Sequence, residues 1–130
     1  MILVDTSVWI DFFNRRPGEA GRELRRLIAE AEPVVLTGVV VLEVLQGLTR
    51  DVEAIEAYLA QWDMLEPQGM ETYRRAAALF RQARGRGIAL TTIDTLIATL
   101  VLENGAVLFT LDRDFTRLAR FTPLRLHRPD

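Results

Sequence analysis

The sequence of 130 residues has no cysteine, no lysine and a single histidine, His127. Without cysteine, disulfides, thiol nucleophiles and thiolate zinc sites are excluded. Without lysine, a Schiff-base lysine, a Walker lysine and a general-base lysine are excluded as well. One histidine cannot supply a two-histidine metal site. Any metal ligands must therefore come mainly from carboxylate and other oxygen donors.

The sequence also lacks an excess of positive charge and a long apolar run. Its formal net charge is −2, so no global basic surface attracts nucleic acid, and a polyanionic substrate would need local arginines and bound metal. The longest apolar run, near residues 96–102, is too short to span a bilayer. The opening "MILVD" has no basic region and reaches an aspartate at once, unlike a signal peptide. We expect a cytoplasmic protein without a membrane segment.

Linker-like stretches, repeats and low-complexity segments are missing too. Hydrophobic residues make up 49% of the sequence and charged residues 26%. This composition is typical of a globular protein, and the length suits one domain with a substantial core. We therefore expect a single domain over residues 1–130.

Short apolar runs alternate with helical patterns along the chain. The expected strands cover residues 1–4, 33–38, 64–67, 106–112 and 124–127. Helices are expected between them, beginning after capping residues such as Thr37 and Thr91. The alternation predicts an α/β fold, a three-layer α/β/α sandwich with a central, mainly parallel β-sheet.

Four carboxylates follow predicted strands or lie in the helices after them: Asp5, Glu43, Asp94 and Asp112. Each has an ordinary structural explanation. Asp5 and Asp112 are typical helix N-caps, and Asp94 stands three residues after Thr91, in a variant of the capping box. Glu43 is predicted to be an exposed helix residue, because the apolar stripe of its helix lies on nearly the opposite face (Val41, Val44, Leu45 and Leu48).

Asp94 has one feature that a cap does not explain. The residues on its face of the helix are apolar, namely Ile97, Ala98 and Val101. An aspartate in that position points toward protein, and the helix N-terminus offsets only about 0.3–1 kcal/mol of its desolvation. A partner for Asp94 is therefore expected.

The positions of the four acids in the predicted fold indicate a shared site. Parallel strands with right-handed crossovers bring their C-terminal ends to one edge of the sheet, where ligands bind in open α/β folds. Close like charges destabilise one another unless a cation neutralises them. A site made only of oxygen ligands suits Mg²⁺ or Mn²⁺, and such sites commonly act on phosphates.

The chain resembles the PIN domain family, and in size and motif order it is similar to VapC-type toxins of toxin–antitoxin pairs. The matching segments are "ILVDTSVWIDFF" at the start, "EVLQG" from Glu43, "DTLIA" from Asp94 and "LFTLDRDF" from Leu108. They occur in the family's order and spacing over nearly the whole chain. Each segment alone is weakly diagnostic, whereas the ordered set is fairly specific.

The resemblance implies a Mg²⁺- or Mn²⁺-dependent endoribonuclease with Asp5, Glu43, Asp94 and Asp112 as the acidic quartet. Asp114 is implied as an outer ligand or support, and two hydroxyl residues as orienting groups (Ser7 and Thr110). It also implies a homodimer, an RNA substrate and a small antitoxin that occludes the acidic cleft. Phosphodiester hydrolysis by an activated water would leave 5′-phosphate and 3′-hydroxyl ends.

The residues that contact RNA are less well defined by the sequence. Candidate phosphate contacts are Arg15 with Arg16, Arg84 with Arg86, and Arg113, each of which is equally well explained as a solvated surface residue. Three aromatic residues could stack on bases, but their spacing after a strand favours the core or a dimer contact: Trp9, Phe12 and Phe13.

Other functions remain open at this point. A phosphoryl acceptor of the receiver or haloacid dehalogenase type also places acids at strand ends, but it relies on a lysine that this chain lacks. A PIN-like nuclease of RNA processing or quality control fits the same residues. A non-catalytic RNA- or protein-binding module is disfavoured, because all four acids are retained.

Overall fold

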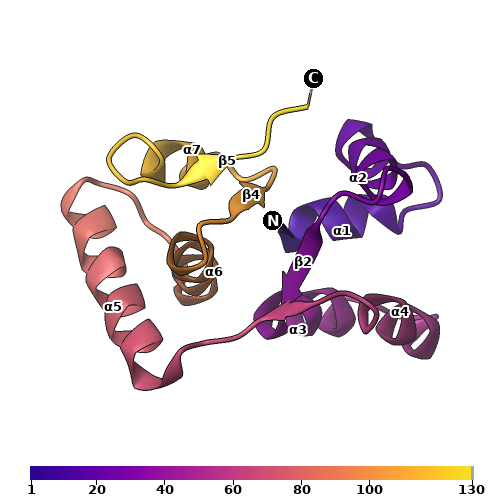
Figure 1. Cartoon of the computed structure of the whole chain (residues 1–130), viewed down its shortest axis with the longest axis horizontal. Coiled ribbons are helices and arrows are strands. Elements are labelled where there is room, and N and C mark those ends of the chain that lie inside the picture. Colours follow the sequence, from indigo (N-terminus) through magenta and orange to yellow (C-terminus); the bar gives the residue numbers. More distant parts are fainter. Residues whose placement is uncertain (130) are drawn as a thin grey trace.

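The computed structural model describes residues 1–129, and a parallel sheet of five strands forms its centre (Figure 1). The strand order is β3-β2-β1-β4-β5, and every neighbouring pair is parallel. Leu3 in the central strand pairs with Val35 on one side and Leu108 on the other. The strands are β1 (Ile2–Val4), β2 (Val34–Thr37), β3 (Met64–Leu65), β4 (Val107–Phe109) and β5 (Arg125–Leu126).

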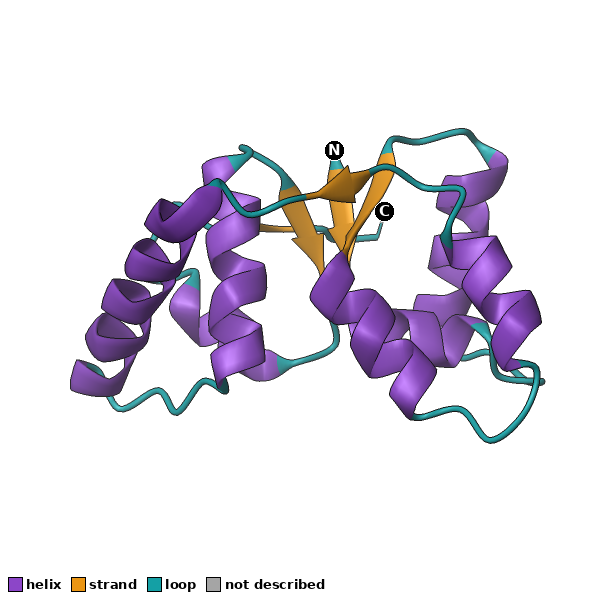
Figure 2. Cartoon of the chain, turned by 90° about the horizontal axis from the view of Figure 1, so that it is seen from below, coloured by secondary structure: helices purple, strands orange, loops and turns teal. Residues whose placement is uncertain are grey.

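Helices cover both faces of this sheet (Figure 2). They are α1 (Thr6–Phe12), α2 (Glu19–Ala29), α3 (Gly38–Gln46), α4 (Val52–Leu59), α5 (Gly69–Gly85), α6 (Thr92–Glu103) and α7 (Arg113–Leu118). Helix α1 packs on α2 and α3, α3 packs on α4, and α5 packs along α6. The predicted three-layer α/β fold is confirmed, and the sheet in the described residues is entirely parallel.

Strand β4 is shorter than the predicted 106–112, because the chain leaves the sheet after Phe109. Thr110 turns its hydroxyl to the side chain of Asp5, and Asp112 already caps helix α7. Side chains that hydrogen-bond to nearby backbone groups compete with a sheet ladder in this way. The strand therefore ends where the polar site begins.

An aromatic cluster joins α1 to α4. Trp9 is fully buried, and its ring centroid lies 5.3 Å from that of Trp62 and 6.5 Å from that of Tyr58. Phe12 and Phe13 pack against the same core. Trp9 is a core residue and presents no face to an RNA base.

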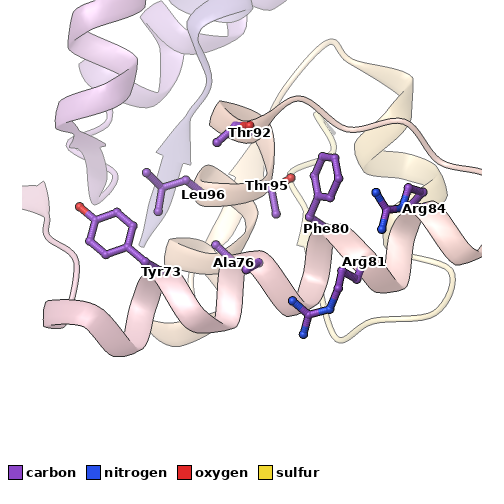
Figure 3. Close-up of a pocket in the computed structure, with 9 residues that line it drawn as sticks. Tyr73, Ala76, Phe80, Arg81, Arg84, Thr92, Thr95 and Leu96 are labelled. Atoms are coloured by element: carbon purple, nitrogen blue, oxygen red, sulfur yellow. The ribbon is translucent and has the colours of Figure 1, made fainter.

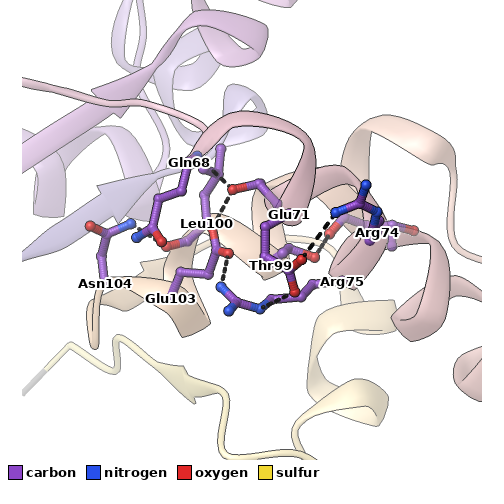
Figure 4. Close-up of polar contacts among 10 residues, drawn as sticks. Gln68, Glu71, Arg74, Arg75, Thr99, Leu100, Glu103 and Asn104 are labelled. Atoms are coloured by element: carbon purple, nitrogen blue, oxygen red, sulfur yellow. Dashed lines mark hydrogen bonds and ion pairs between the residues drawn. The ribbon is translucent and has the colours of Figure 1, made fainter.

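Helices α5 and α6 are joined by a partly buried polar network (Figure 4). Thr72, fully buried in α5, donates its hydroxyl to Glu103 of α6 at 2.8 Å and accepts from the backbone N–H of Gln68 at 2.6 Å. Arg75 pairs with the other Glu103 oxygen at 2.5 Å. The network fixes the C-terminal end of α6 and so helps to set the position of that helix. In residues 1–129, no helix combines the length and apolar character needed to cross a membrane.

The predicted face assignment of α3 is partly wrong. Its buried residues are Val40 and Val44, whereas the predicted apolar stripe opposite Glu43 includes Val44 but not Val40. The apolar face is rotated because α3 packs on α1 and α4 as well as on β2. Glu43 lies three residues from Val40, about one sixth of a turn away. It is half-buried, not exposed.

Candidate active site

Asp5 is the most enclosed of the four acids, with 5% of its surface exposed. It directly follows β1, and its backbone N–H donates to the carbonyl of Phe109 in β4 at 2.8 Å. One carboxylate oxygen accepts from the N–H of Thr6 at 2.8 Å, which makes Asp5 the N-cap of α1. The other oxygen accepts from the hydroxyl of Thr110 at 2.7 Å. The carboxylate of Asp5 is therefore both the N-cap of α1 and a member of the candidate site.

Thr110 connects Asp5 to Asp112. Its hydroxyl donates to Asp5 and accepts from the backbone N–H of Asp112 at 3.0 Å. Asp112 in turn caps α7 by accepting from the N–H of Asp114 at 2.9 Å. The hydroxyl of Ser7 accepts from the N–H of Leu111 at 3.3 Å. Both hydroxyl residues suggested by the sequence resemblance thus contact the loop that carries Asp112.

Asp114 lies one residue beyond this loop, in the first turn of α7. Besides the backbone contact with Asp112, its carboxylate pairs with Arg117 at 3.2 Å on the same helix. The side chain therefore already has a cationic partner. Its contact with Asp112 is made through the backbone N–H.

Glu43 reaches the site from α3. Its Oε1 atom accepts from the hydroxyl of Thr6 at 2.8 Å, across 37 positions of sequence. Thr6 is therefore shared, because its N–H binds Asp5 while its hydroxyl binds Glu43. In the sequence, the "DTS" segment of Asp5, Thr6 and Ser7 indicates only helix-capping residues. Its link to α3 depends on the packing of two helices, which no local sequence pattern shows.

Asp94 enters from the first turn of α6. The predicted cap is confirmed, since the hydroxyl of Thr91 accepts from the N–H of Asp94 at 3.0 Å. The inward face of the helix is confirmed too, because the three apolar residues below Asp94 are fully buried: Ile97, Ala98 and Val101. Asp94 is half-buried at the edge of this apolar face.

The electrostatics show that the four acids are neighbours. The pKa of Asp94 is raised to about 6, first by burial and then by the negative charges of Asp5, Asp112 and Glu43. Burial also raises the pKa of Asp5, against the hydrogen bonds from Thr110 and Thr6, and the charges of Glu43 and Asp112 add to the increase. Segments from four parts of the chain thus bring uncompensated negative charge together.

The donor chemistry of this cluster suits a divalent cation. All four groups offer oxygen, as Mg²⁺ and Mn²⁺ prefer, and a cation would offset the repulsion that raises the pKa of Asp94. Among residues 1–129, however, no three such side chains form a ready-made ligand set. The carboxylates of Asp5 and Glu43 instead accept hydrogen bonds from Thr6 and Thr110.

A separate hollow of ≈ 400 Å³ lies between α5 and α6 (Figure 3). Its lining is mostly apolar and includes Tyr73, Phe80 and Leu96, with Arg81 and Arg84 at one side. None of its lining residues in the described part of the chain, positions 1–129, is a carboxylate. It therefore does not belong to the acidic cluster, although Thr92 and Thr95 of α6 border it close to Asp94.

The candidate RNA contacts occupy different surroundings. Arg113 is exposed at the start of α7, directly after Asp112. The guanidinium of Arg84 lies 5.7 Å from the ring centre of Phe80, and that of Arg86 lies 4.5 Å from the ring centre of Phe121. Arg15 and Arg16 are exposed after α1. Among these arginines, Arg113 directly follows an acid of the cluster, Asp112, in the sequence.

Comparisons with known proteins agree with this fold. A model of the PIN domain family matches residues 2–121. The chain is 33% identical over 129 residues to VapC ribonuclease Mb1587 of Mycobacterium bovis, and the match covers 96% of each protein. Both findings extend over nearly the whole chain.

Two solved structures show the same fold at lower identity. The structure of VapBC2 from Rickettsia felis, bound to a DNA fragment from their promoter, matches with a TM-score of 0.76 at 19% identity over 100% of both chains. A toxin–antitoxin complex from Klebsiella pneumoniae matches with a TM-score of 0.73 at 20% identity, over 97% of this chain and 100% of that chain. With the family model and the mycobacterial relative, they confirm the resemblance seen in the sequence: this chain belongs to the PIN domain family, among the VapC ribonucleases.

Proposed function

We propose that this protein is the endoribonuclease toxin of a toxin–antitoxin pair and that it hydrolyses RNA at the cluster of Asp5, Glu43, Asp94 and Asp112. The observation that carries this proposal is the convergence of these acids, since Thr110 joins Asp5 to Asp112 and Thr6 joins Asp5 to Glu43. Burial, with the added charges of Asp5, Asp112 and Glu43, raises the pKa of Asp94 to about 6. Four independent helix caps or surface charges need not gather at one place. A site that binds a cation and a phosphate needs this concentration of charge.

The proposed metal ligands are Asp5, Asp94 and Asp112, for Mg²⁺ or Mn²⁺. When bound, the ion lowers the pKa of a water molecule and offsets charge on the scissile phosphate. Thr110 orients Asp5 by its hydrogen bond at 2.7 Å, and Thr6 orients Glu43 by its bond at 2.8 Å. Glu43 either contributes a further ligand, directly or through water, or accepts the proton of the attacking water. In-line attack leaves 5′-phosphate and 3′-hydroxyl ends.

The proposed partners follow from the family. The substrate is RNA, and a small antitoxin protein is expected to occlude the acidic cleft. The toxin–antitoxin complex from Klebsiella pneumoniae supports an antitoxin partner, because a chain of that complex has the same fold. A homodimer is proposed on the family resemblance alone.

The decisive experiment is RNA cleavage by the purified protein with and without divalent metal. We expect cleavage with Mg²⁺ or Mn²⁺ and its loss with EDTA or in Asp5→Asn and Asp94→Asn. The matched control is Asp63→Asn, which removes an exposed carboxylate after α4 and should leave cleavage unchanged. Undiminished cleavage in both site variants would show that the acids do not form the active site.

A second measurement separates the toxin from a nuclease of RNA processing or a non-catalytic module. Expression of the wild type in cells without a partner gene should arrest growth, whereas Asp94→Asn should not. Sequencing of the RNA ends from these cells identifies the target. Cleavage in vitro without growth arrest would favour the processing nuclease, and binding without cleavage would favour the module.

A further inference from the structure

Helix α7 and the turn after it carry a row of arginines that begins at the acidic cluster. Arg113 follows Asp112 directly, and Arg117 and Arg120 come four and seven residues later. This spacing puts all three on one side of the helix and of the turn that continues it. All three side chains are exposed. At 1.5 Å per residue, the row extends about 10 Å from the site.

The far end of this row borders a hollow of ≈ 390 Å³ between α7 and the turn after α5. Arg86 contributes a third guanidinium group from the opposite side. Among residues 1–129, no acidic residue lines the hollow, although the net charge of the whole chain is −2. Its lining residues are Arg86, Gly87, Ile88, Arg117, Arg120 and Phe121.

The guanidinium groups in this hollow have few competing partners. Arg86 lies over the ring of Phe121 at 4.5 Å, which holds the cation in place without neutralising it. Within residues 1–129, neither Arg86 nor Arg120 has a carboxylate in ion-pair distance. Arg117 pairs with Asp114 at 3.2 Å, but such exposed pairs contribute only about 0–1 kcal/mol and exchange readily.

We propose that Arg86, Arg117 and Arg120 form a phosphate-binding site that holds the backbone of the RNA substrate away from the scissile bond. The proposal rests on the proposed ribonuclease activity and extends it to substrate positioning. Four clustered carboxylates repel a phosphodiester chain, so cations are needed along its path to the active site. Guanidinium groups match phosphate oxygens in geometry and in charge. Arg113 lies at the other end of the arginine row, directly after Asp112 in the sequence.

An acidic peptide segment is the other polyanion that such a site could accept. The structure favours RNA, because the arginine row starts at the catalytic acids and runs outward from them. A protein ligand of the hollow alone would need no such connection. The binding experiment below therefore includes an acidic peptide probe.

Binding is measured in an Asp94→Asn background, which should prevent cleavage, with a labelled single-stranded RNA. Each phosphate contact to a single strand contributes about 0.7 to the slope of log K against log salt. Arg86→Ala/Arg120→Ala should therefore reduce this slope by about 1.4, which corresponds to about 25-fold weaker binding at about 0.1 M salt. Arg86→Lys/Arg120→Lys retains both charges and should restore most of the slope.

The control variant removes two positive charges at positions outside the arginine row. Arg25→Ala/Arg74→Ala deletes two exposed arginines on α2 and α5, outside the row, and should leave RNA binding nearly unchanged. In the active protein, Arg86→Ala/Arg120→Ala should raise KM with little change in kcat, because these groups contact a part of the RNA that does not react. Thermal melting checks that each variant is folded.

The outcomes distinguish failure of the phosphate-binding site from failure of the ribonuclease proposal. If the wild type cleaves RNA and Arg86→Ala/Arg120→Ala behaves like the control pair, the phosphate-binding site is wrong and the ribonuclease proposal stands. The site is equally wrong if the alanine variant loses affinity for a labelled poly-glutamate peptide but not for RNA. If the wild type neither binds nor cleaves RNA, both proposals fail together.

Discussion

Thr110 is the residue through which two acids of the site share one hydrogen-bonded unit. Its hydroxyl donates to Asp5 at 2.7 Å and accepts from the N–H of Asp112 at 3.0 Å. Thr110→Val keeps the shape and removes both contacts. Loss of a group that orients a metal ligand typically costs about 10–100-fold in metal affinity or activity. Titration of RNA cleavage with Mg²⁺ should show this loss.

The control for Thr110→Val is Thr116→Val, an equal change at an exposed position of α7. It should leave the Mg²⁺ dependence of cleavage unaltered. If Thr110→Val matched this control in both metal dependence and rate, the hydroxyl would have no part in orienting Asp5.

Asp94 should destabilise the protein when no metal is bound. Its pKa is raised to about 6 from an ordinary value of 3.8, so at pH 7 its ionisation costs free energy of folding. This cost develops as the pH rises from about 4 to about 6 and persists above that range. Asp94→Asn should therefore stabilise the protein in EDTA at pH 7 by about 1 kcal/mol, after solvent screening of this half-exposed group and the lost helix-terminus interaction are allowed for. This stabilisation should appear as a higher melting temperature.

The pH dependence of the stability of Asp94→Asn tests whether ionisation of Asp94 causes the destabilisation. At about pH 4 the wild-type carboxyl is largely protonated in the folded protein, so the advantage of Asp94→Asn should shrink. Asp63→Asn, at an exposed position, is the matched control. A melting temperature of Asp94→Asn below that of the wild type at pH 7 would mean that the carboxylate has a stabilising partner.

Among the elements, α6 shows what local sequence can predict about the site. Thr91 caps the helix in the way that its spacing from Asp94 indicates, and the face below Asp94 is buried as its apolar residues require. Both features depend on residues within three turns of one another. Asp5 and Asp112 are caps for the same local reason, and the parallel sheet then brings them to one edge.

Helix α3 shows where local sequence is insufficient. The orientation of its buried face depends on contacts with α1 and α4, and this is why the predicted side of Val40 was wrong. For the same reason the bond between Glu43 and Thr6 was not predicted, since it depends on where two helices distant in sequence come together. Tertiary packing commonly overrides a helical pattern in a short helix.

The network between α5 and α6 should contribute to stability and to the placement of Asp94. Thr72→Val removes a buried hydroxyl that serves both Gln68 and Glu103 and leaves their polar atoms without this partner. We expect a loss of about 1–3 kcal/mol in the free energy of unfolding, measured by urea denaturation. Thr116→Val is again the exposed control, and an equal stability of the two variants would contradict a structural role for the network.

The whole molecule should respond to metal through its folding equilibrium. A cation that binds only the folded state stabilises it by mass action, by about 2.7 kcal/mol at 100 times its dissociation constant. Millimolar Mg²⁺ or Mn²⁺ should therefore raise the melting temperature of the wild type. The increase should be smaller in Asp5→Asn and unchanged in Asp63→Asn. A flat response of the wild type would argue against convergence of the four acids on one ion.

Near the C-terminal end of the chain, His127 contacts the buried Glu23 of α2, a carboxylate that should make stability depend on acid pH. Glu23 is buried, accepts hydrogen bonds from Arg26 at 2.7 Å and lies 2.7 Å from His127, whose ring packs on Phe109. The hydrogen bond from Arg26 is the main cause that lowers the pKa of Glu23 from 4.5 to about 2, with a further contribution from His127.

Because this pKa is lowered in the folded state, the stabilisation is complete above about pH 4.5 and is lost as the pH falls toward 2. Glu23→Gln should therefore lower the free energy of unfolding by about 1–3 kcal/mol at pH 7, and its deficit should shrink toward pH 2. Thermal melts across this range, with the exposed Glu32→Gln as control, measure the effect. A deficit that stays constant down to pH 2 would show that Glu23 acts through packing and not through its charge.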